Sequence, residues 1–138
     1  MKVENLVTRA LRLIQVIDPL QSVKAADMET AIVALNGMMA RIEADGIALG
    51  WSPVENPSDD LPLPVEAEQA IAYNLAVTVA PEYGVTPLPA VQGMAITGMA
   101  DLMRDVAVAT PIRPILSVPL PDNWDIRDIT GASWYAGP

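Results

Sequence analysis

The stretch PVEAEQAIAYNLAVTVAPEYG, from Pro64 to Gly84, decides how the chain folds. Its opening proline is suited to the first turn of a helix, where no intrahelical hydrogen bond is lost. Glu66 and Glu68 follow at the end of the helix where the dipole favours negative charge. These features predict a helix that begins near Val65.

The same stretch carries an apolar stripe at helical spacing, which predicts burial against a core. The stripe consists of Ala67, Ala70, Ile71, Leu75, Thr78 and Val79. A proline inside a helix costs about 3 kcal/mol because it clashes with a carbonyl one turn back. Pro81 therefore predicts that the helix ends near Ala80, with Gly84 turning the chain.

The composition excludes several kinds of chemistry. The chain has 138 residues, about one domain, and contains neither cysteine nor histidine. Disulfides, thiolate nucleophiles, Ser-His-Asp triads and cysteine-ligated zinc are thereby excluded. We expect no catalytic residues, no cofactor and no metal site.

The charge is strongly negative and unevenly distributed. The formal net charge is −9, and no lysine or arginine lies between Arg41 and Arg104. Such a surface repels phosphate, so we expect DNA to slide past it without binding. No apolar run approaches the roughly 18 residues that span a bilayer, and no targeting peptide is visible, so we expect no membrane contact and synthesis in a cytoplasm.

A first helix is predicted before Asp18-Pro19, from apolar residues on one face. They are Val3, Leu6, Val7, Ala10, Leu13, Ile14 and Ile17. Lys2, Arg9 and Arg12 lie on the opposite side. These bases form either a solvated face or a contact with an acidic partner or DNA.

A second helix is predicted from a Ser22 cap to about Asp45, with Gly46 as its stop. Asn36-Gly37 is typical of a hairpin turn, but the apolar period continues through it. The residues in that period are Met28, Ala31, Ile32, Leu35, Met38, Met39 and Ile42. We therefore expect Gly37 to lie inside the helix and to admit a neighbouring helix.

A proline-rich loop is predicted from Ile47 to Leu63, between the second and third helices. Ile47 to Trp51 could form a short strand, and Leu61 to Leu63 an extended edge segment. Asp59 and Asp60 are interpreted as turn formers rather than metal ligands, because no further ligands stand at coordinating spacing.

The fourth predicted helix starts at Thr86-Pro87-Leu88-Pro89 and continues to about Ala109. One apolar face contains Val91, Met94, Ala95, Gly98, Leu102 and Val106, and a second contains Ile96, Met99 and Met103. A helix that is apolar on two sides should be covered on two sides. The alternatives are a plain core and a subunit interface, and the interface candidates are Gly93, Ile96, Gly98, Met99 and Met103.

The segment from Thr110 to Pro138 is rich in proline and has no helical period, so it predicts an extended arm that lies along a neighbour. Large aromatic residues carry much of the binding energy at interfaces. The expected anchors are Trp124, Ile126, Trp134 and Tyr135. The alternative is a tail folded back on its own helices.

Polar residues in the third helix have a structural interpretation. Tyr73 and Asn74 are expected to hydrogen-bond a neighbouring segment. Glu66 and Glu68 are a poor carboxylate pair because residues two apart on a helix point in different directions. A wall-degrading enzyme using carboxylates, carried by a virion, and a small acidic cytoplasmic regulator remain as alternative functions.

The string AIAYNLAVTVAPEYGV, from Ala70 to Val85, resembles the head-to-tail adaptor proteins of tailed bacteriophages, the packaged-DNA-stabilisation or tail-accessory family. The second helix is similar as well, in Ala25-Ala26, in Ala34-Leu35-Asn36 and in Asp45-Gly46. The resemblance spans roughly Asn5 to Asp105.

The predicted helices make an all-α fold, a small four-helix bundle in residues 1–109 with an extended arm in residues 110–138, and the resemblance also implies a small helical bundle. It also implies a homo-oligomeric ring, typically of twelve copies, beneath the portal protein at the head-tail junction of the virion. Such a ring would extend the DNA channel, help to retain packaged DNA and present a surface to the downstream tail or nozzle protein. The arm would reach the portal or a neighbouring subunit.

Overall fold

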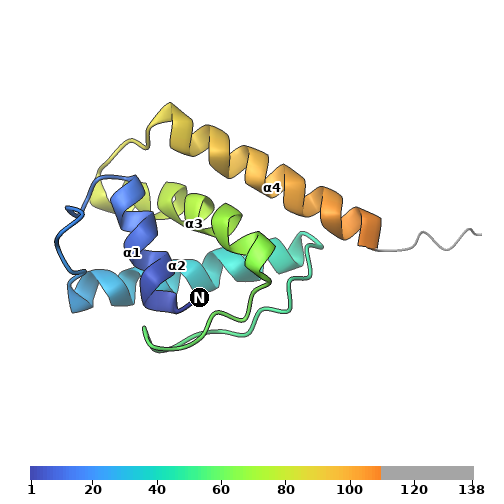
Figure 1. The fold of residues 1–138 in the computed structure, drawn as a ribbon, viewed down its shortest axis with the longest axis horizontal. Coiled ribbons are helices and arrows are strands. Elements are labelled where there is room, and N and C mark those ends of the chain that lie inside the picture. The colour runs from blue at the N-terminus through green and yellow to red at the C-terminus, as the bar shows by residue number, and fades with distance from the viewer. Residues whose placement is uncertain (110–138) are drawn as a thin grey trace, which may run out of the picture.

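The computed structural model describes residues 1–109, and this part of the chain is a small all-α bundle (Figure 1). Its four α-helices confirm the predicted fold class. In chain order the elements are α1 (Val3–Leu13), α2 (Ala25–Ala44), α3 (Val65–Val79), the 3-10 helix η1 (Ala80–Tyr83) and α4 (Pro89–Ala109).

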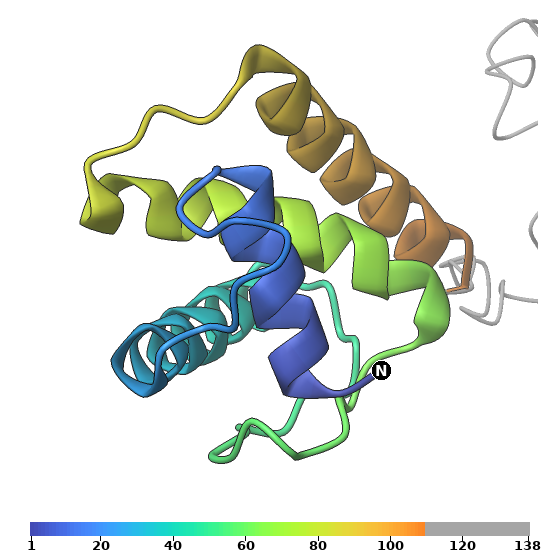
Figure 2. The same cartoon turned by 60° about the vertical axis from the view of Figure 1, so that its left-hand side comes forward.

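Helix α3 is the centre of the bundle. It packs against α1, α2 and α4, and the views in Figures 1 and 2 place α4 on one side of it and α1 with α2 on the other. The predicted stripe is buried except for Thr78, and Ala72 and Ala76 are buried as well. Small alanines on several sides of α3 let three helices approach it.

The ends of α3 and the start of α4 follow the prolines as predicted. Pro81 lies within η1, which continues α3 as a tighter 3-10 turn, and Gly84 then takes the left-handed conformation at φ 66°. Because glycine has no Cβ, this conformation carries little steric cost. Pro89 is the first residue of α4.

The predicted end of the first helix is wrong. Helix α1 ends at Leu13, and Gln15 adopts φ 60°, so the chain leaves the helix before Asp18-Pro19. Ile14 and Ile17 are nevertheless buried. The core contact was predicted correctly, but it is made by an irregular turn.

The predicted cap of the second helix is also wrong. Lys24, not Ser22, is the N-cap of α2, and its side chain makes no capping hydrogen bond. The helix does continue through Asn36-Gly37 and ends before Gly46, as expected. Gly37 does not admit a neighbouring helix, since a Cβ built there would meet no atom within 4 Å.

The segment from 47 to 63 contains no strand and crosses the bundle as a loop, so the strand considered for Ile47 to Trp51 is absent. Ile47, Val54 and Leu61 anchor it in the core. The carbonyls of Asp59 and Pro57 accept hydrogen bonds from the amides of Val3 and Glu4, at 3.1 and 2.9 Å. The loop thus satisfies the free amides that begin α1.

Within residues 1–109, none of the helices has the length and apolar character needed to cross a bilayer. The predicted division into a body and an arm places the arm outside the described residues.

Candidate interaction surfaces

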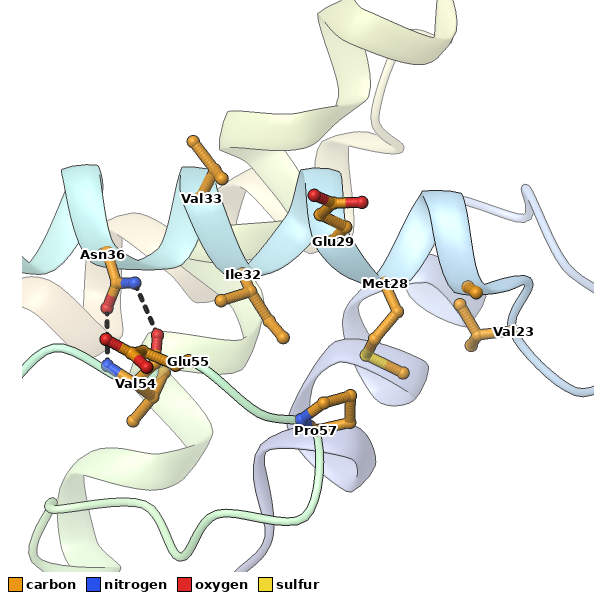
Figure 3. Close-up of a pocket in the computed structure, with 10 residues that line it drawn as sticks. Val23, Met28, Glu29, Ile32, Val33, Asn36, Val54, Glu55 and Pro57 are labelled. Atoms are coloured by element: carbon orange, nitrogen blue, oxygen red, sulfur yellow. Dashed lines mark hydrogen bonds between the residues drawn. The ribbon is translucent and has the colours of Figure 1, made fainter.

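A groove of about 670 Å³ lies between α2 and the loop that follows it (Figure 3). Its lining comes from two segments and is mostly apolar. The lining residues are Val23, Ala25, Met28, Glu29, Ile32, Val33, Asn36, Val54, Glu55 and Pro57. Met28 and Ile32 point from α2 towards Pro57 on the opposite wall. The groove is of a size that accommodates part of a peptide or a small ligand.

Asn36 holds the two walls of this groove together. Its side-chain amide donates to the carbonyl of Val54 at 2.8 Å, and its side-chain oxygen accepts from the Val54 amide at 3.1 Å. These two bonds satisfy both backbone groups of a buried loop residue, which would otherwise be costly to bury. The asparagine that suggested a hairpin turn is therefore a clamp between helix and loop.

Asp59 shapes the tip of the loop. Its carboxylate accepts from the amides of Asn56 at 2.9 Å and Glu55 at 3.2 Å. These donors, chiefly the Asn56 amide, lower the pKa of the Asp59 carboxyl below its usual value. Asp59 is a turn former, as expected from sequence.

Helix α4 packs closely against α3. A Cβ built on Gly98 would lie only 2.8 Å from the Ala70 Cβ, so Gly98 is required by the packing of these two helices. Asn74 donates from α3 to the Ala95 carbonyl of α4 at 3.1 Å. The expected hydrogen bond from Asn74 to a neighbouring segment is present.

The opposite side of α4 carries an exposed row of apolar and small residues. Ile96 is 71% exposed and Met103 is 50% exposed. The full row is Gly93, Ile96, Ala100, Met103 and Ala107, at alternating spacings of three and four residues. Such spacing is typical of a seam that packs against another helix.

The five predicted interface residues therefore divide into two groups. Gly98 contacts α3, and Met99 is half-buried against the core. Gly93, Ile96 and Met103 lie on the exposed row, and a Cβ on Gly93 would meet no atom within 4 Å. Only this second group is available to a partner.

Two tyrosines make specific polar or cationic contacts. The Tyr83 hydroxyl donates to Asp27 of α2 at 3.2 Å. Burial and the neighbouring Asp27 carboxylate raise the pKa of Tyr83 to about 12. Tyr73 lies under the guanidinium of Arg9, 5.8 Å from the ring centre, so part of the basic face of α1 rests on α3.

Glu66 and Glu68 lie in different surroundings on α3. Glu68 accepts from the amino group of Met1 at 2.9 Å, whereas Glu66 lines a different hollow, between α3 and α4. No group of three potential metal ligands occurs in residues 1–109. The geometry agrees with the interpretation that Glu66 and Glu68 are not a working pair.

The predicted arm anchors, Trp124, Ile126, Trp134 and Tyr135, lie outside the described residues. The groove beside α2 was not predicted from sequence. Its one sequence signal was Asn36, a polar residue within an apolar helix that had no assigned partner.

The described residues thus form a small helical protein with an open groove beside α2 and an exposed apolar row on α4. The sequence profile of the P22 tail accessory factor family matches residues 2–137, nearly the whole chain. The chain belongs to this family. It is a phage tail-associated protein with a structural role, and a component of the virion.

A comparison with curated protein sequences gave no match.

Proposed function

We propose that the protein is a structural head-to-tail adaptor, not an enzyme, that forms a ring beneath the portal of a tailed phage. The ring, of twelve copies as the resemblance implies, extends the DNA channel and helps to retain packaged DNA. It also provides the attachment surface for the downstream tail or nozzle protein. The site of action is the head-tail junction, after assembly in the host cytoplasm.

The exposed row on α4 is the observation that carries this proposal. Monomeric proteins rarely leave a continuous apolar seam uncovered, and in the described part α4 packs extensively against α3 alone. A ring needs a heterologous contact, in which one surface of each copy meets a different surface of the next. The α4 row supplies one such surface.

The acidic middle of the chain suits a channel through which DNA slides. Carboxylates repel the phosphate backbone, so duplex DNA passes without being held. We propose that acidic residues from the stretch between Arg41 and Arg104 line the lumen. A structure of the assembled ring that placed basic residues on the lumen, and the acids on the outer rim, would contradict this part of the proposal.

The central experiment measures the native mass of the protein alone, of its portal alone and of the mixture. A fixed high-order complex in the mixture is expected. Ile96→Glu should prevent assembly while leaving the helical circular dichroism unchanged, because Ile96 is exposed in the single copy. Thr97→Glu, on the same helix and also exposed but outside the row, is the control for added charge.

The arm is tested separately by ending the chain after Ala109. Residues 110–138 contain the predicted anchors, so the shortened protein should remain helical and no longer dock on the portal. Replacing Trp124 and Trp134 by alanine in the full chain should weaken docking in the same direction. Undiminished docking of the shortened chain would show that the arm does not hold the portal.

A further inference from the structure

We propose that the groove between α2 and the loop binds the first part of the arm, residues 110–121, from a neighbouring copy of the same chain. The inference relies on the proposed function only for the presence of several copies side by side. The groove and the segment are each argued from their own chemistry.

The groove is preformed rather than a gap between mobile parts. Both hydrogen bonds of the Asn36 clamp close one end of it, and Val54 anchors the loop wall in the core. Its walls are apolar along Met28, Ile32 and Pro57, while Glu29 and Glu55 are exposed at its rim. An occupant should therefore be extended, apolar and positively charged at one point.

Residues 110–121 have these properties. The segment reads TPIRPILSVPLP, and Arg113 is its only charged residue. Pro111 and Pro114 flank Arg113 in a P-x-x-P spacing, which favours the extended polyproline conformation that docks in apolar grooves at low entropic cost. Arg113 complements Glu29 at the rim.

The geometry favours a neighbouring copy over the chain's own arm. The end of α4 lies near the loop residue Leu49, because Val106 and Leu49 line the same hollow. This part of the loop lies beside the end of α2, because the Trp51 amide donates a hydrogen bond to the Glu43 carboxylate. Glu29 lies about 21 Å further back along α2 at 1.5 Å per residue. The backbone from Ala109 to Arg113 spans about 14 Å when fully extended, so Arg113 cannot reach Glu29 of its own chain.

A fluorescently labelled synthetic peptide of residues 110–121 tests the groove on the full-length protein by anisotropy. Saturable binding is expected. Glu29→Lys should weaken it about threefold to tenfold, because an attraction becomes a repulsion. A peptide carrying Arg113→Glu should bind the wild-type chain weakly and regain affinity for the Glu29→Lys chain.

Two alanines at the start of α2 provide a matched steric test. Ala25 lines the groove and Ala26 does not, and both are exposed. Ala25→Trp should obstruct the groove and reduce peptide binding, whereas Ala26→Trp should leave it unchanged. Asp105→Lys, at an exposed position on α4 outside the groove lining, is the control for a charge reversal.

Engineered cysteines identify the donor copy, because the natural chain has none. Copies carrying Pro57→Cys and copies carrying Ile112→Cys should form a disulfide between chains when mixed. In dilute solution, a chain carrying both changes should form little intramolecular disulfide. Efficient closure within one chain would overturn the assignment to a neighbouring copy.

The groove proposal is overturned if the peptide shows no saturable binding up to about 1 mM, or binds the Glu29→Lys and Ala25→Trp chains as well as the wild type. Its failure is distinct from failure of the adaptor function. Peptide binding is measured without the portal, whereas ring formation on the portal is measured by native mass.

Discussion

The bundle joins its elements in two different ways, and the contrast explains where its open surfaces lie. Helix α4 is held to α3 by close apolar approach, with Gly98 against Ala70 and a buried Leu102. The loop and η1 are held to α2 by polar ties from Asn36 and Tyr83.

Each kind of contact leaves a different surface free. Close approach fixes one side of α4 and leaves the opposite side, with Ile96 and Met103, uncovered. The Asn36 clamp holds the loop at the distance of a side chain from α2, and the groove remains beside it. The two candidate interaction surfaces thus follow from how the monomer is assembled.

The largest effect is expected from removing an apolar side chain between α3 and α4. Leu102 is 6% exposed, and Leu102→Ala should lower the free energy of unfolding by about 2–4 kcal/mol through lost burial and a residual cavity. Ile96→Ala, on the outer side of α4, should change it by less than about 0.5 kcal/mol. Urea denaturation followed by circular dichroism measures both.

Equal losses in these two variants would contradict the one-sided packing of α4. They would indicate that Ile96 is covered in the isolated protein, either by a second copy or by another part of the chain.

The next largest change in stability is expected when glycine is replaced by alanine at position 98 of α4, compared with the same replacement at position 93. Gly98→Ala places a Cβ 2.8 Å from that of Ala70, so the helices must separate, and we expect a loss of about 1–3 kcal/mol. Gly93→Ala meets no neighbour and should stabilise the helix by about 0.5–1 kcal/mol. Thermal unfolding of the two variants should therefore shift in opposite directions.

A stabilising Gly98→Ala would show that helix propensity outweighs the close contact. In that case the tight approach of α3 and α4 would not be what fixes the position of α4.

The apolar contacts were predictable from sequence because they follow from local patterns of apolar residues and prolines. The period of Ile71, Leu75 and Val79 identified the buried side of α3, and the prolines at 64, 81 and 89 marked helix boundaries. Gly93 and Gly98 were both predicted as interface candidates, but only Gly98 makes a close contact, and that contact is with α3. Only the path of a neighbouring helix distinguishes the two glycines.

The two polar contacts with α2 were not predictable in the same way, because each joins residues far apart in sequence and neither partner was identified. Asn36 and Val54 are 18 residues apart, and Tyr83 and Asp27 are 56 apart. The groove depends on the first tie and was missed with it. The end of α1 was misplaced because Gln15, a residue type that seldom adopts positive φ, ends the helix with backbone hydrogen bonds from Gln15 to Arg12 and from Val16 to Leu11.

Removing the Asn36 hydrogen bonds to the loop should lower the free energy of unfolding by as much as Gly98→Ala does, or by less. Asn36→Ala leaves the amide and carbonyl of the buried Val54 without partners, which should cost about 1–3 kcal/mol. Gly37→Ala, at the next position, has open space and should be neutral or stabilising. Hydrogen exchange at the Val54 amide, compared between the two variants, measures the loosening directly.

An unchanged exchange rate at Val54 in Asn36→Ala would contradict the clamp. If the clamp is as described, the same variant should also bind the 110–121 peptide less well, because the groove loses one wall.

The smallest effect is expected from the tie between η1 and α2. Tyr83→Phe removes the hydroxyl that donates to Asp27 and should cost about 0.5–1.5 kcal/mol near neutral pH. Because the pKa of Tyr83 is raised to about 12 in the folded protein from an ordinary value of 10, the wild-type advantage is complete below pH 10. It should shrink as the pH rises from 10 towards 12, where the unfolded phenol is ionised and the folded one resists ionisation.

Denaturation of both proteins across this range measures the difference, and other alkaline titrations affect the two equally. A difference that stays constant to pH 12 would show that the Tyr83 hydroxyl is not held against Asp27, and that α3 ends without a polar tie to α2.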